Sequence, residues 1–508
     1  MLRQPVRRPA GGVKRTLGLG MVALAAVAVI SSSAWLAYTS ASASTMVTGG
    51  FGWGNNQTGE LDDGTTVMRT KPDASIGLTG ITTMSAGLWH CLAIRSNGSV
   101  IAWGHNASGE LGDGTTTDAS SPVNVVGISH AGLVSSGGVF SLAVGSNGSV
   151  LSWGHNASGE LGVGTLTDSP IPVHVTGLGS GSGVVAISAG NTFALALKSD
   201  GTVLAWGNNA SGELGDGTLT DSPIPVQVKG LGSGSGVVAI SAGYSFSLAL
   251  KSDGTVLAWG NNASGELGNG KAPTDSSVPV QVKGLGSGSG VRAISAGGAF
   301  GMALKSDGTV LAWGNNASGE LGNGKAPTAS TRPVSVSGLR GVRQISAGYT
   351  HALALARGGV YAWGDNALGQ IGDGSTKNAT RPVPISGFGG YQVLGVFAGG
   401  NHSHALIGPL QTKPSPSQAP KPTPRPSTAP SATPSAKPSP KPSPKPSPKP
   451  SAKPSATKIP GVTPPPSTAA PASEGTSASP NSAGRWKAAA LSAVLIGGLL
   501  LGGWRWRR

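Results

Sequence analysis

Acidic residues recur at turn positions in this chain, where carboxylates could act as general acids and bases or bind calcium. Glutamates recur in Gly-Glu-Leu segments, at Glu110, Glu160, Glu213, Glu266 and Glu320, and aspartates recur in Gly-Asp-Gly segments, at Asp113, Asp216 and Asp373. A catalytic site needs unlike groups at one place, whereas these residues are distributed along the sequence. We therefore interpret them as structural, with the glutamates capping turn amides. Calcium is the alternative for the acidic turns, but no copy has the full acidic spacing of a calcium loop.

Histidines could serve as general bases or metal ligands, and three of them occupy one recurrent position, three residues after a glycine. They are His90, His351 and His402, and the other copies of this position hold Phe140, Phe193, Phe246 and Phe300. Phenylalanine at the same place indicates a packed location, so the sequence favours buried structural histidines over general bases. His404 has no counterpart in the other copies.

The single cysteine, Cys91, lies in the apolar segment GLWHCLAI and is predicted to be a buried small hydrophobe. No intramolecular disulfide is possible, and no CxxC or Cys/His spacing indicates zinc. The chain also has no Ser/His/Asp arrangement, HExxH motif, Walker loop or paired catalytic carboxylates. We predict no catalytic residue, no metal and no cofactor.

These residues are positioned by a repeat that is centred on a Trp-Gly pair, as in WGNNASGELG from Trp206. The seven copies begin at Trp53, Trp103, Trp153, Trp206, Trp259, Trp313 and Trp363, with spacings of 50, 50, 53, 53, 54 and 50 residues. A period of this size is typical of closed or stacked arrays of small modules. The tryptophans are therefore predicted to be structural. The NAS and NGS triplets, such as the one at Asn106, match glycosylation acceptors, but they coincide with the recurrent turn, which explains them.

Each repeat reads as a small antiparallel sheet. In residues 237–259, alternating apolar residues flank Asp253-Gly254, which predicts a hairpin. Val237 to Ser241 supplies another strand, and residues 224–228, with their proline, supply a short outer one. The array begins inside a strand at Gly49 and ends with strand-like residues 404–407, so we expect both ends of the chain to complete one sheet and close a ring.

The Trp-Gly, NxxGELG and AGxxHxxAL elements resemble the regulator of chromosome condensation repeat family, over about residues 48–408. The resemblance implies an all-β fold, a seven-bladed β-propeller of four-stranded antiparallel blades. Family members include a nuclear exchange factor for a small GTPase, a plant ultraviolet-B photoreceptor and secreted bacterial β-lactamase-inhibitory proteins. Their shared property is protein recognition by a propeller face, which leaves the function of this chain open.

Differences between the repeats are where specificity is expected. A variable pair follows each recurrent glycine: Leu88-Trp89, Gly138-Val139, Asn191-Thr192, Tyr244-Ser245, Gly298-Ala299, Tyr349-Thr350 and Gly400-Asn401. In a propeller these pairs lie near blade corners, where loops gather on one face. Trp89, Tyr244 and Tyr349 are candidate anchors for a partner, and Asn401 joins them as a candidate on the same face. Local corner packing is the alternative.

The net charge of +15 suggests nucleic-acid binding until the charges are placed. Residues 1–43 carry +5 and residues 409–508 carry +13, which leaves −3 for residues 44–408. The repeat array lacks the basic footprint that nucleic acid requires, so we predict no nucleic-acid partner.

The two ends of the chain predict export and anchoring. Residues 1–43 have a basic start, an apolar stretch and Ala41-Ser42-Ala43, typical of a signal peptide; an uncleaved N-terminal anchor is the alternative. Residues 409–485 are rich in Pro, Lys and Ser, which predicts an extended disordered spacer able to contact cell-wall polymer. Residues 486–508 are apolar between tryptophans and end in arginines, which predicts a transmembrane helix with a cytoplasmic tail.

From these features we expect residues 44–408 to form a propeller displayed outside the cell, which binds a protein partner, or less readily a wall glycan, through one face. An extracellular polysaccharide lyase or hydrolase is the first alternative, with a site assembled from unlike residues of several blades. A GTPase exchange factor, by analogy with the family, is the second, and it conflicts with the predicted signal peptide.

Overall fold

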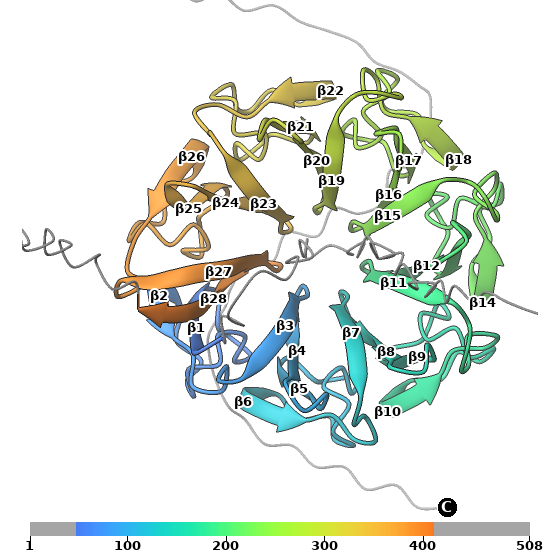
Figure 1. Cartoon of the computed structure of the whole chain (residues 1–508), viewed down its shortest axis with the longest axis horizontal. Helices are drawn as coiled ribbons and strands as arrows, with labels where there is room; N and C mark the ends of the chain where they lie inside the picture. Colours follow the sequence, from blue (N-terminus) through green and yellow to red (C-terminus); the bar gives the residue numbers. More distant parts are fainter. Residues whose placement is uncertain (1–46, 411–508) are drawn as a thin grey trace, which may run out of the picture. The chain divides into compact units, whose positions relative to one another are not determined.

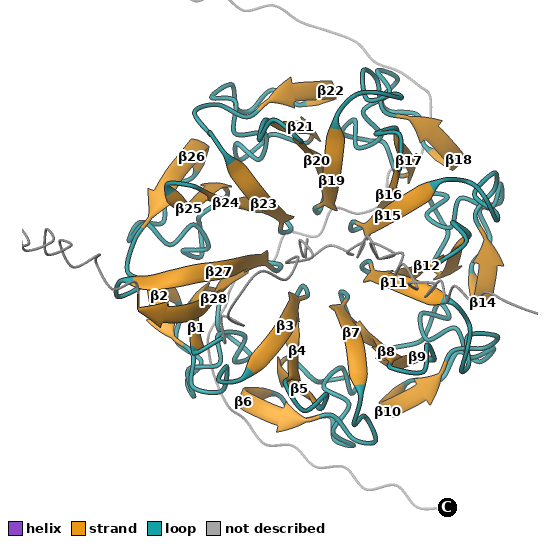
Figure 2. Cartoon of the chain, viewed as in Figure 1, coloured by secondary structure: helices purple, strands orange, loops and turns teal. Residues whose placement is uncertain are grey.

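The computed structural model describes residues 47–410 of the 508-residue chain. The predicted signal peptide and C-terminal transmembrane segment lie outside the described residues, as does the predicted spacer apart from residues 409 and 410, which end the last strand. Figure 2 shows that the described part consists of strands joined by loops. Within residues 47–410 no helix is long and apolar enough to cross a bilayer.

Seven four-stranded sheets form the blades of a ring, each radiating from a common axis (Figure 1). The innermost strands are β3 (Ile81–Ala86), β7 (Ala131–Ser136), β11 (Val184–Ala189), β15 (Val237–Ala242), β19 (Val291–Ala296), β23 (Val342–Ala347) and β27 (Tyr391–Ala398). The second strands are β4 (His90–Arg95), β8 (Phe140–Gly145), β12 (Phe193–Lys198), β16 (Phe246–Lys251), β20 (Phe300–Lys305), β24 (His351–Ala356) and β28 (His402–Leu410).

The third strands carry the Trp-Gly pairs: β5 (Val100–Gly104), β9 (Val150–Gly154), β13 (Val203–Gly207), β17 (Val256–Gly260), β21 (Val310–Gly314), β25 (Gly359–Gly364) and β1 (Gly49–Gly54). The outer strands are β6 (Ala119–Asn124), β10 (Ser169–His174), β14 (Ser222–Gln227), β18 (Ser276–Gln281), β22 (Ser330–Ser335), β26 (Ala379–Ile385) and β2 (Arg69–Ala74). We number the blades 1 to 6 from β3–β6 to β23–β26, and blade 7 is the sheet β2-β1-β28-β27.

Blade 7 closes the ring with strands from both ends of the array. β1 pairs antiparallel with β28 over six residue pairs, from Gly49 opposite Ile407 to Gly54 opposite His402. This pairing confirms the predicted closure and the predicted all-β propeller of four-stranded antiparallel blades. It also covers the strand edges that an open array would expose.

The Trp-Gly pair is explained by the backbone beside it. Gly207 has φ 99°, and a Cβ atom there would lie 2.6 Å from the carbonyl oxygen of Thr192. Only glycine combines this left-handed backbone with such a close approach. The pairing of β13 with β14 is also irregular at this point, between Ala205 and Gly207. The glycine therefore lets the chain leave the third strand and enter the long turn that precedes the outer strand.

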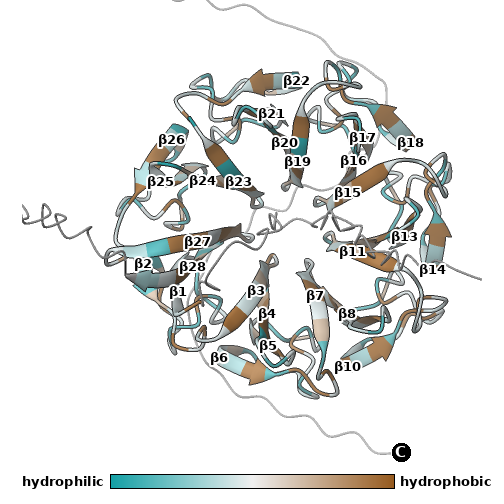
Figure 3. Ribbon diagram, viewed as in Figure 1, coloured by the Kyte–Doolittle hydropathy of each residue, from teal (hydrophilic) through white to brown (hydrophobic). Residues whose placement is uncertain are grey.

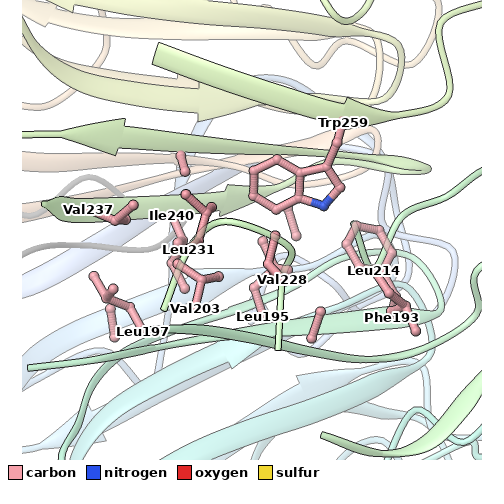
Figure 4. Packing of buried hydrophobic residues seen from close by; sticks show 14 residues of the cluster. Phe193, Leu195, Leu197, Val203, Leu214, Val228, Leu231, Val237, Ile240 and Trp259 are labelled. Atoms are coloured by element: carbon pink, nitrogen blue, oxygen red, sulfur yellow. The ribbon is translucent and has the colours of Figure 1, made fainter. Parts of the chain in front are cut away.

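Apolar side chains fill the spaces between blades. Trp259 packs with residues of blades 3 and 4, among them Phe193, Val228 and Ile240, in one buried cluster (Figure 4). Hydrophobic colour lies along strands such as β11 and β15, while many peripheral loops are pale or teal (Figure 3). All seven repeat tryptophans are fully buried. Because a blade is only one sheet thick, burial of its faces depends on both neighbouring blades.

The tryptophans also join consecutive blades by hydrogen bonds. Each indole Nε1 donates to a backbone carbonyl in the turn of the preceding blade, at 2.8–2.9 Å: Trp103 to Glu60, Trp153 to Glu110, Trp206 to Glu160, Trp259 to Glu213, Trp313 to Glu266, Trp363 to Glu320 and Trp53 to Gln370. The last of these bonds completes a closed circuit. Each tryptophan thus satisfies a buried carbonyl while it fills the space between two blades.

We expect Trp206→Phe to destabilise the ring more than Trp259→Phe, by about 1 kcal/mol. Both changes remove a similar volume and one indole N–H. In the second case Ser247 Oγ still donates to the Glu213 carbonyl at 3.0 Å, whereas the Glu160 carbonyl next to Trp206 faces Ala194 rather than a serine. Denaturant midpoints of the two variants measure the difference, and equal midpoints would contradict the role given to the indole hydrogen bond.

Candidate functional site

The corner turns between the first and second strands of each blade gather around the axis on one face of the ring. They surround a small open hollow, lined by the recurrent Ala-Gly or Ser-Gly pairs and by Leu88, Gly138, Asn191, Tyr244, Gly298 and Tyr349. The first residue of each variable pair faces this hollow in six of the blades, while the second residue does not line it. The hollow is therefore shaped by the positions at which the repeats differ.

Backbone hydrogen bonds link most of the corner turns around the axis. In six of the seven blades the first residue of the variable pair donates its N–H to the carbonyl of the corner glycine of the next blade at 2.9–3.2 Å, as Leu88 does to Gly137; Asn191 of blade 3 is the exception. The same contact joins Gly400 of blade 7 to Gly87 of blade 1 at 2.9 Å. The side chains at these positions are therefore presented on a firmly held backbone.

Two tyrosines from different blades meet over the hollow. The rings of Tyr244 and Tyr349 are 5.2 Å apart between centroids, at 60° to each other. Gly298 of the intervening blade makes this possible, because a Cβ atom there would lie 2.3 Å from the Tyr349 carbonyl oxygen and 2.7 Å from its ring. Burial, with Tyr244 nearby, raises the pKa of Tyr349, so its hydroxyl stays neutral at ordinary pH.

The structure places the four predicted face residues in two different settings. Tyr244 and Tyr349 line the hollow and contact each other, with 38% and 39% of their surface exposed. Trp89 is 39% exposed on the same face but outside the lining, and its carbonyl accepts the N–H of His105. The carbonyl of Asn401 likewise accepts the N–H of Asn55 at 2.8 Å. Asn401 therefore belongs to corner packing as much as to the surface.

The recurrent glutamates cap turn amides, as predicted. One carboxylate oxygen of each accepts a backbone N–H two residues earlier at 2.8–2.9 Å, as Glu160 does from Ser158. Burial raises the pKa of five of these carboxyls, those of Glu60, Glu160, Glu213, Glu266 and Glu320. A perturbed carboxyl usually suggests a functional site, but the same shift in five blades follows from the repeated turn.

The second oxygen of the turn glutamate has a partner that differs between blades. In blade 7, Asn55 Nδ2 donates to Glu60 at 2.7 Å; His105 and His155 take the same place at 3.2 Å from Glu110 and Glu160. Blade 6 reverses the polarity, because Gln370 Nε2 donates to Asp365 at 2.8 Å. The two positions of this pair therefore change together from blade to blade, so that each of these four turns keeps one hydrogen-bond donor and one acceptor.

The asparagines of the NAS triplets are buried parts of the same turn. Those of the two NGS triplets, Asn97 and Asn147, are exposed in hairpin turns instead, so the prediction that these triplets coincide with the recurrent turn is wrong. Asn106 is fully buried; its Nδ2 donates to the carbonyls of Thr115 and Thr117, and its Oδ1 accepts the N–H of Leu111. A folded turn of this kind does not offer its amide for glycosylation. This geometry supports the structural interpretation of the NAS triplets.

The three recurrent histidines are fully buried between blades. His90 Nε2 lies 2.8 Å from Ser141 Oγ, which donates to the Glu110 carbonyl, and His351 makes the same contact with Ser403 at 2.9 Å. Because the serine hydrogen is already donated, the histidine proton lies on Nε2. Burial lowers the pKa of His90 to about 4 and that of His351 to about 3. His90 and His351 are therefore neutral packing residues, as predicted.

Cys91 is buried as predicted, but it belongs to a cluster that the sequence interpretation missed. Its Sγ lies 3.3 Å from His402 Nε2 and 3.4 Å from His404 Nε2, at the interface of blades 7 and 1. Cys91 is 311 and 313 residues away from the two histidines along the chain, so no local spacing could have joined it to them. The unmatched His404 was the available signal. Burial raises the pKa of the Cys91 thiol, which makes it a poor nucleophile in this setting.

Asp62 is a second residue peculiar to one blade. It has φ 56°, where the other copies of GELG have glycine, and its fully buried carboxyl accepts the N–H of Gly77 at 2.9 Å. Burial, and secondarily the neighbouring Asp63, raise the pKa of Asp62 to about 7. The departure from GELG is visible in the sequence, but its burial is not.

A closed ring of seven four-stranded blades with a Trp-Gly pair in each third strand defines this protein as a seven-bladed β-propeller. Residues 134–408 match the RCC1-like domain, and residues 81–110 and 97–144 match the regulator of chromosome condensation (RCC1) repeat. The chain belongs to the RCC1-like family, as the resemblance in its sequence implied.

Curated relatives match part of the array. The human probable E3 ubiquitin-protein ligase HERC6 is 34% identical over 177 residues, which is 34% of this chain and 17% of HERC6. The Arabidopsis thaliana mitochondrial RCC1 domain-containing protein RUG3 is 32% identical over 182 residues, which is 34% of this chain and 40% of RUG3. The chain thus spans well under half the length of these relatives.

Solved structures share the fold at lower sequence identity. Prp20p from Saccharomyces cerevisiae superposes with a TM-score of 0.63 at 23% identity, covering 72% of this chain and 93% of Prp20p. Human WBSCR16 has a TM-score of 0.62 at 23% identity, covering 71% of this chain and 98% of WBSCR16. These likenesses establish the propeller architecture.

We predict that Gln370→Glu destabilises blade 6 and that Asp365→Asn in the same chain restores it. The single change sets a carboxylate against Asp365 in place of the amide that donates at 2.8 Å. The double variant recreates the Asn55–Glu60 pair of blade 7. A double-mutant cycle on denaturant midpoints should give a favourable coupling of roughly 1 kcal/mol or more; strictly additive effects would refute the exchange of the pair as a unit.

Proposed function

We propose that the propeller is a binding module, without catalytic activity, that recognises a protein partner through the face that carries the corner turns. The observation that carries this proposal is the group of half-exposed aromatic side chains on that face, Trp89, Tyr244 and Tyr349. Large aromatic side chains lose little conformational entropy on binding and dominate interface energies. Here their backbone is fixed by hydrogen bonds to the corner glycines of neighbouring blades or to the turns of their own blade, so binding a partner costs little further loss of backbone entropy.

The lining of the axial hollow favours binding over polysaccharide cleavage. Glycoside hydrolysis generally uses two carboxyl groups on opposite sides of the scissile bond. Among the described residues, the hollow is lined by small residues, Leu88, Asn191 and the two tyrosines, with no carboxyl or imidazole group. The perturbed glutamates are distributed around the ring in equivalent turns and do not converge on one point.

Relatives provide context for a protein partner. Prp20p has been described for its binding properties to Gsp1p and histones, and yeast RCC1 (Prp20) has been crystallised with Kap60 bound. A propeller of this fold can therefore bind several unlike proteins. For this chain we favour a partner outside the cell over a nuclear or GTPase partner, because the repeat array carries a net charge of −3 between a predicted signal peptide and a predicted anchor.

The same proposal places the ring on the outer side of a membrane. Residues 1–43 would direct export, residues 409–485 would act as a spacer and residues 486–508 would anchor the chain. Brief protease treatment of intact cells should then release propeller fragments into the medium, because a spacer that is extended, as its sequence predicts, would be open to cleavage. A propeller that becomes accessible only after cell lysis would rule out surface display.

We expect a triple change on the proposed face to weaken partner capture at least about tenfold. The variants Tyr244→Asn, Tyr349→Gly and Trp89→Val install residues that other blades use at these positions, Asn191, Gly298 and Val139. Affinity capture from the producing cells' surface and medium, with the full chain as bait, followed by quantitative titration of the captured protein, measures the effect.

A matched control changes exposed apolar residues on the rim. Leu166→Thr with Leu219→Thr removes two side chains that are 59% and 62% exposed, and it installs the residue of blade 1, Thr116. This variant should capture the partner as the unmodified chain does. Loss of capture in the rim variant alone would overturn the assignment of the face, and turnover of wall glycans by the purified chain would favour the enzymatic alternative.

A further inference from the structure

We propose that Cys91, His402 and His404 form a zinc site that fastens the closing blade to the first blade. Cys91 lies on β4 of blade 1, whereas both histidines lie on β28 of blade 7, two residues apart and therefore on the same side of that strand. The Sγ and the two Nε2 atoms all lie within 4.8 Å of one another, and all three residues are fully buried.

The spacing of these atoms fits tetrahedral coordination. With Zn–S near 2.3 Å and Zn–N near 2.0–2.1 Å, a sulfur and a nitrogen on a tetrahedral ion lie roughly 3.5–3.6 Å apart. The observed Sγ to Nε2 distances of 3.3 Å and 3.4 Å are slightly shorter, so a small outward shift of the side chains would admit the ion. A thiolate with two imidazoles is a donor set that suits zinc. Binding would release the Cys91 thiol proton and use the Nε2 lone pair of each histidine.

The repeats of the chain supply an internal comparison for this site. At the position of His404 the other blades have Leu92, Leu142, Leu195, Leu248, Met302 and Leu353. All six of these side chains are fully buried. An imidazole at this position therefore replaces a buried apolar side chain. A polar group introduced into such a core costs free energy unless it gains a partner. In the metal-free ring the partners of His404 Nε2 are the Glu60 carbonyl at 3.0 Å and Cys91 Sγ at 3.4 Å. The substitution therefore places a nitrogen ligand beside the thiol, and we infer that a bound metal would take that nitrogen.

A second departure from the repeat lies opposite His404. Gly52 pairs with His404 across the strands, where the other blades have alanine or serine, such as Ala102 and Ser152. A Cβ atom at Gly52 would lie 2.8 Å from the Leu61 carbonyl oxygen. The turn can therefore approach closely, and the Glu60 carbonyl comes within 3.0 Å of His404 Nε2. This oxygen is the nearest polar atom on the remaining side of the cluster.

The closing interface also lacks a hydrogen bond that the other interfaces have. In six interfaces a serine of the innermost strand accepts the backbone N–H of an alanine or serine in the next blade at 2.9–3.0 Å. Blade 7 has Phe397 at the serine position. A metal that joins β28 to β4 would link residues 311–313 apart and supply a tie at the interface where this bond is missing.

The test refolds the full chain from chelator-treated denaturant with or without Zn²⁺ and then removes free metal. We expect about one tightly held zinc ion per chain, and a higher melting temperature for the zinc-loaded protein. Co²⁺ in place of Zn²⁺ should give a thiolate-to-cobalt charge-transfer band, which reports Cys91 directly.

Variants taken from the chain's own repeats distinguish loss of the site from loss of the fold. Cys91→Ser installs the serine that blades 2 and 7 have at this position, Ser141 and Ser403, and His404→Leu installs the usual leucine. Both variants should therefore fold. Both should also lose the zinc, the cobalt band and the zinc-dependent rise in melting temperature. His351→Phe, which recreates blade 3 at a remote interface, should keep all three. Unmodified protein that holds no stoichiometric zinc, or holds copper but not zinc, overturns the proposal, as does full zinc retention by both Cys91→Ser and His404→Leu.

Discussion

The burial of blade faces is the constraint on which this structure depends. A four-stranded blade is one sheet thick, so neither of its faces is covered unless another blade packs against it. The repeat tryptophans contribute to this contact at every interface: each is fully buried between two blades and donates to a carbonyl of the preceding blade. Because the circuit includes Trp53 and Gln370, the pairing of β1 with β28 supports the packing of every other blade.

Repetition and difference have separate roles in this molecule. Residues that recur in all or nearly all blades hold the ring together: the tryptophans, the turn glutamates and the buried asparagines each make the same contact in several blades. A contact shared by several blades cannot distinguish one place on the ring from another. Residues that differ between blades can, and those of most interest for function lie at the corner positions around the axis and at the interface of blades 7 and 1.

Much of the fold could be predicted from the sequence because the relevant information is local and repeated. The Trp-Gly spacing predicted the number of blades, and the strand-like segments at Gly49 and His404 predicted the closure. The candidate site was predicted less completely. The corner pairs indicated a face, but the contact of Tyr244 with Tyr349 depends on the absence of a side chain at Gly298 in the blade between them. The Cys91 cluster depends on ring closure, which brings together residues that have no local pattern in common.

The central claim is that specificity lies where the blades differ on the axial face, and hydrogen exchange of the full chain with and without its captured partner tests it most directly. The account predicts added protection in peptides that contain the corner turns at residues 87–89, 243–245 and 348–350. Protection confined to the opposite face, in the hairpins at residues 199–202 and 252–255, would contradict it.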